Sequence, residues 1–101
     1  MIRHIVMWQF AEEAAGGTRA QNLERARAGL AALDGLVPGL LSLDVVVPTD
    51  DLEHTHDLLL VADFESPAAL AAYAGHPRHV EVAQFIGQVR TSRACVDHHL
   101  D

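Results

Sequence analysis

Ile2-Arg3-His4-Ile5-Val6-Met7-Trp8-Gln9-Phe10 begins the chain with a regular alternation of side chains. Successive residues of a β-strand point to opposite faces, so this pattern predicts a strand over residues 2–10. The more apolar face carries Ile2, His4, Val6, Trp8 and Phe10. A histidine therefore lies among residues expected to face the core.

Further elements follow this strand in a clear order. Residues 11–17 are expected to form a loop, and Thr18 with Gln21 has the spacing of a capping box at the start of a helix that Gly35 ends. Strands are predicted over residues 40–47, about 56–64 and about 91–98. In the third strand, His56 begins an apolar face that continues to Phe64.

Two more helices meet at the segment Tyr73-Ala74-Gly75-His76-Pro77-Arg78-His79. Ser66 is a suitable N-cap and Pro67 a suitable first residue for a short helix over residues 67–74, which Gly75 should end. Pro77 cannot continue that helix but can open the next one, over residues 77–89. His79 then lies in the first turn, on the side that faces the core.

The order strand, helix, strand, strand, helix, strand predicts an α+β, ferredoxin-like βαββαβ fold with a four-stranded antiparallel sheet. Its helices can cover only one face of that sheet. The other face would expose Ile5, Met7, Leu59 and Val61, which are too apolar to be left in water. We therefore expect a homodimer that pairs through the sheet face.

Composition bounds the function. We expect residues 1–101 to form a single domain. The net charge of −7 at pH 7, with seven arginines scattered and no lysine, argues against nucleic acid or an anionic membrane as partner. No transmembrane or secretory segment is visible, and Cys95 is the single cysteine, so a cytoplasmic location is expected.

His79 is the strongest candidate for chemistry. The first turn of a helix carries partial positive charge, which disfavours a protonated imidazole, so His79 should be neutral near pH 7. A neutral imidazole could take a proton, while helix N–H groups or the Tyr73 hydroxyl stabilise the resulting oxyanion. The structural alternative is that both residues only cap and fill a helix junction.

The chain also resembles a known family. The residues are the opening Ile2-Arg3-His4-Ile5-Val6, His56-Asp57 before a strand that ends in Phe64-Glu65-Ser66, Tyr73 followed by His76-Pro77-Arg78-His79, and the closing Val96-Asp97. They resemble the stress-responsive dimeric α+β barrel (Dabb) proteins, and within them polyketide cyclases of the olivetolic acid cyclase type. The resemblance covers nearly the whole chain.

This resemblance implies a dimeric α+β barrel with one pocket per subunit, binding a small hydrophobic carbonyl or aromatic compound. It implies catalysis without a cofactor by His79 as base and Tyr73 as its partner, closing a ring by aldol condensation or isomerising the substrate. His4 and His56 would line the same pocket. We assign the remaining substrate-binding positions to Trp8, Leu23, Leu30 and Phe85.

Other functions stay open from the sequence. One is a non-catalytic stress-related or ligand-binding dimer, and another is a cofactor-independent monooxygenase of aromatic compounds, which Trp8 would suit. The histidines of His54-Thr55-His56 and His98-His99 could bind zinc or copper. Metal binding is nevertheless not expected, because adjacent histidines near a chain end are usually solvated and no Cys or carboxylate falls into a recognised zinc spacing. Cys95 has no evident activating partner and is expected to be structural.

Overall fold

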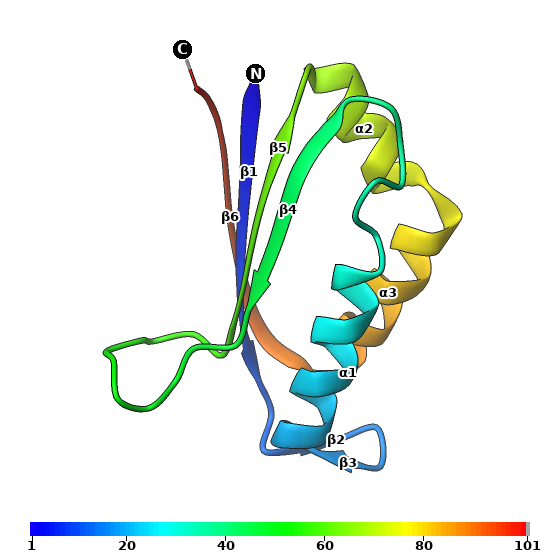
Figure 1. Ribbon diagram of the computed structural model, residues 1–101. Helices are drawn as coiled ribbons and strands as arrows, with labels where there is room; N and C mark the ends of the chain where they lie inside the picture. Colours follow the sequence, from blue (N-terminus) through cyan, green and yellow to red (C-terminus); the bar gives the residue numbers. More distant parts are fainter. Residues whose placement is uncertain (101) are drawn as a thin grey trace.

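The computed structural model describes residues 1–100. A four-stranded antiparallel sheet in the order β4-β5-β1-β6 forms one layer, and three helices lie on one of its faces (Figure 1). The elements are β1 (Ile2–Phe10), β2 (Glu13–Ala14), β3 (Gly17–Thr18), α1 (Arg19–Ala31), β4 (Leu40–Val46), β5 (Leu58–Phe64), α2 (Pro67–Gly75), α3 (Pro77–Val89) and β6 (Arg90–His99). This is the ferredoxin-like α+β fold that the order of elements predicts.

The predicted capping box opens α1. The Gln21 backbone N–H donates to Thr18 Oγ1 at 3.2 Å, and the Thr18 N–H donates to Gln21 Oε1 at 3.0 Å. The helix ends at Ala31, earlier than predicted. Gly35 instead lies in the following turn with a φ of 74°, a conformation that glycine adopts without strain.

A short hairpin occupies most of the segment predicted as a loop. β2 and β3 pair around Ala15 and Gly16, whose φ angles of 50° and 77° are both positive, as in the tight two-residue turns of β-hairpins. Such turns usually contain Asn-Gly or Asp-Gly, so Ala-Gly gave a weak signal. The buried Asn22 side chain donates to the Ala14 carbonyl at 3.0 Å and ties the hairpin to α1.

His76 forms the junction between α2 and α3. Its backbone N–H donates to the Tyr73 carbonyl at 3.2 Å at the end of α2, which continues through Gly75. Its Nδ1 atom accepts from the Arg78 N–H at 3.1 Å and so caps α3. One residue therefore ends the first helix and begins the second, and Pro77 takes the first position of α3 as predicted.

The two faces of the sheet differ in cover. Toward the helices, the side chains of β1 and β5 alternate into a fully buried core. On the open face, Ile5 lies between Val61 and Val96, and Met7 lies between Leu59 and Ala94. Val96 is 60% exposed. The apolar open face predicted from the sequence is therefore present, and nothing within residues 1–100 covers these strands there (Figure 1).

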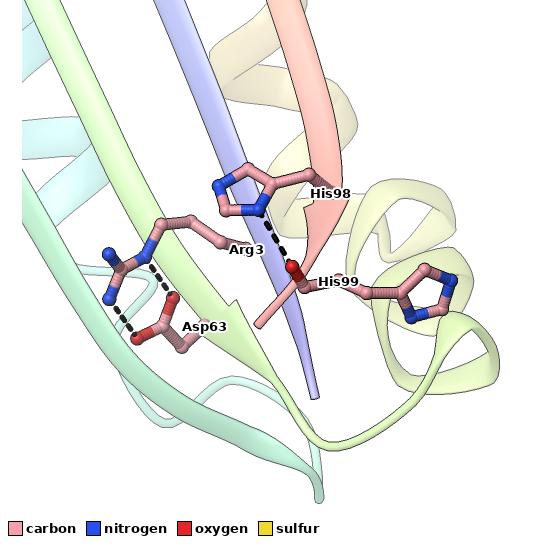
Figure 2. Close-up of polar contacts among 4 residues, drawn as sticks. All are labelled: Arg3, Asp63, His98 and His99. Atoms are coloured by element: carbon pink, nitrogen blue, oxygen red, sulfur yellow. Dashed lines mark hydrogen bonds and ion pairs between the residues drawn. The ribbon is translucent and has the colours of Figure 1, made fainter. Parts of the chain in front are cut away.

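A polar row borders this apolar face. Arg3 on β1 binds Asp63 on β5 through two parallel hydrogen bonds of 2.8 and 3.0 Å. His98 lies opposite Arg3 in the β1–β6 register, and Figure 2 shows its ring directed to the other side of the strand from that of His99. The two imidazoles do not converge on one point.

No helix within residues 1–100 combines the length and the apolar character needed to span a membrane.

Candidate functional site

A cavity of about 150 Å³ lies between the sheet and the helices. It is lined from both layers by His4, Val6, Trp8, Leu30, Leu60, Tyr73, His79, Ala83, Ile86, Arg90 and Arg93. Five of the predicted site residues, His4, Trp8, Leu30, Tyr73 and His79, therefore lie on one cavity. Apolar walls with a few converging polar groups are typical of sites for small molecules.

His56 does not lie on this cavity, which corrects the prediction from the sequence. β5 begins at Leu58, so the alternation does not extend back to His56, which lies in the preceding loop. Its Nδ1 atom is 2.8 Å from Thr55 Oγ1. His56 instead lines a hollow of about 480 Å³ shared with Met7 and Leu59, on the open face of the sheet.

Leu23 and Phe85 also lie outside the cavity. Both are partly buried against the core. The Phe85 ring lies beneath the Arg25 guanidinium, whose carbon is 3.9 Å from the ring centroid. The inner face of α3 is centred on the buried Ile86 and Val89, so Phe85 is directed to the side, toward α1. Helical spacing predicts which residues face inward but not which of them reach the cavity.

The hydrogen bonding of His79 fixes its tautomer. Its Nδ1 atom lies 3.0 Å from the Ala74 carbonyl oxygen, and because a carbonyl can only accept, Nδ1 must carry the proton. In the neutral ring Nε2 then holds a free lone pair. Burial is the main cause that lowers the pKa of His79, and the charges of His4 and Arg93 lower it further, against the effect of the Ala74 bond. Burial therefore favours the neutral form of the His79 imidazole over the protonated form.

The Tyr73 hydroxyl is buried without a partner. The residue is 1% exposed, its ring centroid lies 4.6 Å from that of His79, and its oxygen makes no hydrogen bond within residues 1–100. Burial raises the pKa of Tyr73 to about 12, so the hydroxyl keeps its proton at neutral pH. A hydrogen-bond donor without an acceptor thus lies on the ring beside His79, whose Nε2 atom carries no proton.

His4 is held from the opposite wall by β6. Its Nδ1 atom lies 2.5 Å from Asp97 Oδ1, and Cys95 Sγ is 3.9 Å from the same nitrogen. These three side chains are the one group within residues 1–100 whose ligand atoms, all within 4.8 Å of one another, could hold a metal ion. The signal was present in the sequence, since Cys95 and Asp97 are two apart on a strand and share a face. The pKa of the Cys95 thiol is raised, mainly by burial.

Two arginines complete the cavity wall and were missed from the sequence. Arg93 lies opposite Trp8 in the β1–β6 register, and directly opposed residues of antiparallel strands point to the same face. Arg90 is the first residue of β6, immediately after α3. The alternation of β6 relative to β1 would have revealed Arg93, but that register cannot be read from the sequence.

The sequence model of one protein family, the stress responsive A/B barrel domain (Dabb), matches residues 2–100 of this chain. The chain belongs to this family. The match confirms the resemblance found in the opening strand and in the Tyr73 to His79 segment. No curated protein sequence matches this Dabb chain at a significant level.

Solved structures share the Dabb fold of this chain. A dimeric ferredoxin-like protein of unknown function from Bacteroides fragilis is 22% identical, with a TM-score of 0.84 over 98% of this chain and 95% of its own. Another from Jannaschia sp. is 26% identical, with a TM-score of 0.77 over 98% of each chain. SnoaB, a cofactor-independent oxygenase from Streptomyces nogalater, is 13% identical, with a TM-score of 0.75 over 99% of this chain and 93% of its own.

Proposed function

We propose that the cavity is the active site of a cofactor-independent enzyme that removes a proton next to a carbonyl group, as a cyclase or isomerase does. His79 is the base and Tyr73 binds the carbonyl oxygen. The observation that carries this proposal is the unpaired Tyr73 hydroxyl on a ring that lies 4.6 Å, centroid to centroid, from the ring of His79, whose Nδ1 atom is bound to the Ala74 carbonyl. Buried polar groups without a partner are rare, and they cluster where a ligand supplies the missing partner.

The chemistry follows from these two groups. The Tyr73 hydroxyl donates a hydrogen bond to the substrate carbonyl, and His79 Nε2 takes a proton from the adjacent carbon, leaving an enolate and an imidazolium. In an isomerisation the imidazolium returns the proton to another carbon. In an aldol cyclisation the enolate carbon attacks a second carbonyl of the same molecule, and the new alkoxide receives that proton.

The size of the cavity limits the substrate. An apolar cavity of about 150 Å³ accommodates a molecule such as benzene, and the volume found here is about 150 Å³. Val6, Leu60 and Ile86 supply an apolar wall for such a ring. We therefore propose a substrate about one ring in size, rather than a long polyketide, as the group that enters the cavity.

Proton abstraction can be tested without knowing the natural substrate. Acetophenone or cyclohexanone is incubated with the protein in D₂O, and NMR follows the exchange of the protons next to the carbonyl. We expect exchange above the buffer rate, lost in both Tyr73→Phe and His79→Gln but kept in His54→Gln, since His54 lies in the 47–57 loop and does not line the cavity. Exchange that persists in both site variants would refute the proposed roles.

A monooxygenase is the second candidate. Trp8 and His4 face the same cavity, and a cofactor-independent oxygenase shares the fold. An oxygen electrode separates the two reactions, because proton abstraction alone consumes no oxygen. Ligand binding without exchange or oxygen uptake would instead indicate a non-catalytic binding protein of the stress-related type.

We further propose that the chain acts as a cytoplasmic homodimer joined through the open face of its sheet. Ile5, Met7 and Val61 supply apolar surface there. The relatives from Bacteroides fragilis and Jannaschia sp. are described as dimeric, which supports this arrangement.

A further inference from the structure

We infer that the ligand of this cavity carries a carboxylate, which Arg90 and Arg93 bind at the cavity wall. The inference rests on the proposed function in taking the same cavity as the ligand site, and it adds the class of substrate. It follows from the position of the two guanidinium groups at the cavity wall, from the absence of a carboxylate paired with either of them and from the absence of acids among the described residues that line the cavity.

The position of Arg93 is set by strand pairing. Its partner in the β1–β6 register is Trp8, which is 6% exposed and faces the helices, so the Arg93 side chain starts on the same face. The charge of Arg93 reaches His79, whose pKa it lowers. Arg90 enters from the end of α3 and lines the same cavity. Both arginines remain exposed to water at their outer side.

The Arg93 guanidinium interacts with the Cys95 thiol rather than with an acid. Among the other arginines, Arg3 binds Asp63 and Arg27 binds Glu24. Arg19 and Arg78 each donate to a backbone carbonyl, and Arg25 lies over the Phe85 ring. Within residues 1–100, neither Arg90 nor Arg93 forms an ion pair with a carboxylate.

Acidic side chains are also absent from the cavity wall. The chain has 14 Asp and Glu residues against seven arginines, yet none of the acids that the structure describes lines the cavity, whereas two of the arginines do. Asp97 lies on the same strand as the two arginines, but one of its carboxylate oxygens lies 2.5 Å from His4 Nδ1. In an acidic protein, a cavity with two cations and no acid favours a negatively charged ligand.

The geometry indicates which anion fits. A guanidinium group matches a planar carboxylate through two parallel hydrogen bonds. The apolar wall takes the ring, the Tyr73 hydroxyl takes the carbonyl oxygen at the buried side, and the arginines take the carboxylate at the exposed side. The ligand class is thus an oxo acid about one ring in size, with its carbonyl and carboxylate apart.

Benzoate and benzamide test this inference, because they share size and shape but differ in charge. The fluorescence of Trp8, the one tryptophan of the chain, reports entry into the cavity, and ligand-observed NMR gives an independent Kd. We expect benzoate to bind at least about tenfold more tightly than benzamide. In Arg90→Gln/Arg93→Gln this preference should vanish through weaker benzoate binding, with benzamide unchanged.

Arg27→Gln is the matched control, since Arg27 is an exposed arginine on α1 that pairs with Glu24 away from the cavity. It should keep the preference for benzoate. Equal binding of the two probes by the wild type, no detectable binding of either, or an unchanged preference in the double variant would each overturn the inference. These outcomes do not depend on turnover. Failure of the exchange test in D₂O would therefore refute the enzyme proposal while leaving the carboxylate site intact.

Discussion

At the scale of single residues, the site is defined by what its groups lack. His79 has a lone pair on Nε2 because Ala74 holds the proton on Nδ1, and Tyr73 has a proton without an acceptor. A merely structural pair would be expected to bond to each other or to the backbone. Here the Tyr73 hydroxyl and the Nε2 atom of His79 both remain without a partner from the protein, although both side chains are packed between the helices and the sheet.

Tyr73→Phe should stabilise the protein and inactivate it. A buried hydroxyl without a partner costs free energy on folding, and its removal should raise the free energy of unfolding by about 1 kcal/mol. The same change removes the donor to the substrate carbonyl. Denaturant titration and the exchange assay measure the two effects on one sample. A loss of stability would mean that the Tyr73 hydroxyl has a hydrogen-bond partner in solution. The proposed function would then lose the observation on which it rests.

The pH dependence should reflect His79. Its pKa lies below the ordinary 6.5, mainly because of burial, so exchange should rise with pH through a midpoint below 6.5 and then stay constant. The unfolded chain binds this proton near 6.5 and the folded chain only at lower pH. Stability from this residue is therefore complete above 6.5 and falls as the pH drops toward the folded pKa.

The change in stability is measured as the difference between the wild type and His79→Gln, because the chain has seven histidines. The two proteins should differ in their slope of unfolding free energy against pH only below 6.5. Parallel slopes there would show that His79 titrates normally and is not desolvated.

At the scale of elements, the junction between α2 and α3 places the base. His76 ends one helix through its backbone and caps the next through its ring, and His79 follows in the first turn of α3. We therefore expect the orientation of the His79 imidazole to depend on His76, a residue that does not line the cavity.

His76→Ala should cost about 1 kcal/mol of stability, as loss of an N-cap does, and should also slow exchange by disturbing His79. His76→Asn should restore both, because asparagine is a favoured N-cap residue. Circular dichroism and the exchange assay measure the two effects. Full exchange in His76→Ala would show that the cap does not position His79.

Regular elements were predictable from the sequence, whereas their contacts were not. Alternation located β1 and most of β5, while the N-caps Thr18 and Ser66 and the first-turn Pro77 located the helix starts, because these signals are local. The hairpin at Ala15 was not predicted because Ala-Gly is an unusual pair of turn residues. Arg93 was not predicted as a cavity residue because its position depends on the β1–β6 register. His56 was placed wrongly because β5 begins only at Leu58.

At the scale of the whole molecule, the two faces of the sheet differ in what they present. The helix-covered face encloses the cavity, and the open face carries the apolar side chains of Ile5, Met7 and Val61. The proposed interface and the proposed active site therefore lie on opposite sides of a single layer of strands, with β1 contributing to both.

Val61→Asp should convert a dimer into monomers. The side chain lies between Asp44 and Ile5 near the centre of the open face, and a carboxylate buried there would lack a cation. Sedimentation velocity measures the change. Val80→Asp is the matched control, because Val80 is 39% exposed on α3. A dimer that survives Val61→Asp would place the interface elsewhere.

The unpaired Tyr73 hydroxyl also offers a practical route to the natural compound. The protein itself supplies no acceptor for this hydroxyl, and a molecule that accepts its hydrogen bond stabilises the folded state. Metabolites can therefore be sorted by how far they raise the melting temperature, with no assay for any reaction. A compound that stabilises the wild type but not Tyr73→Phe would be recognised through this one oxygen atom.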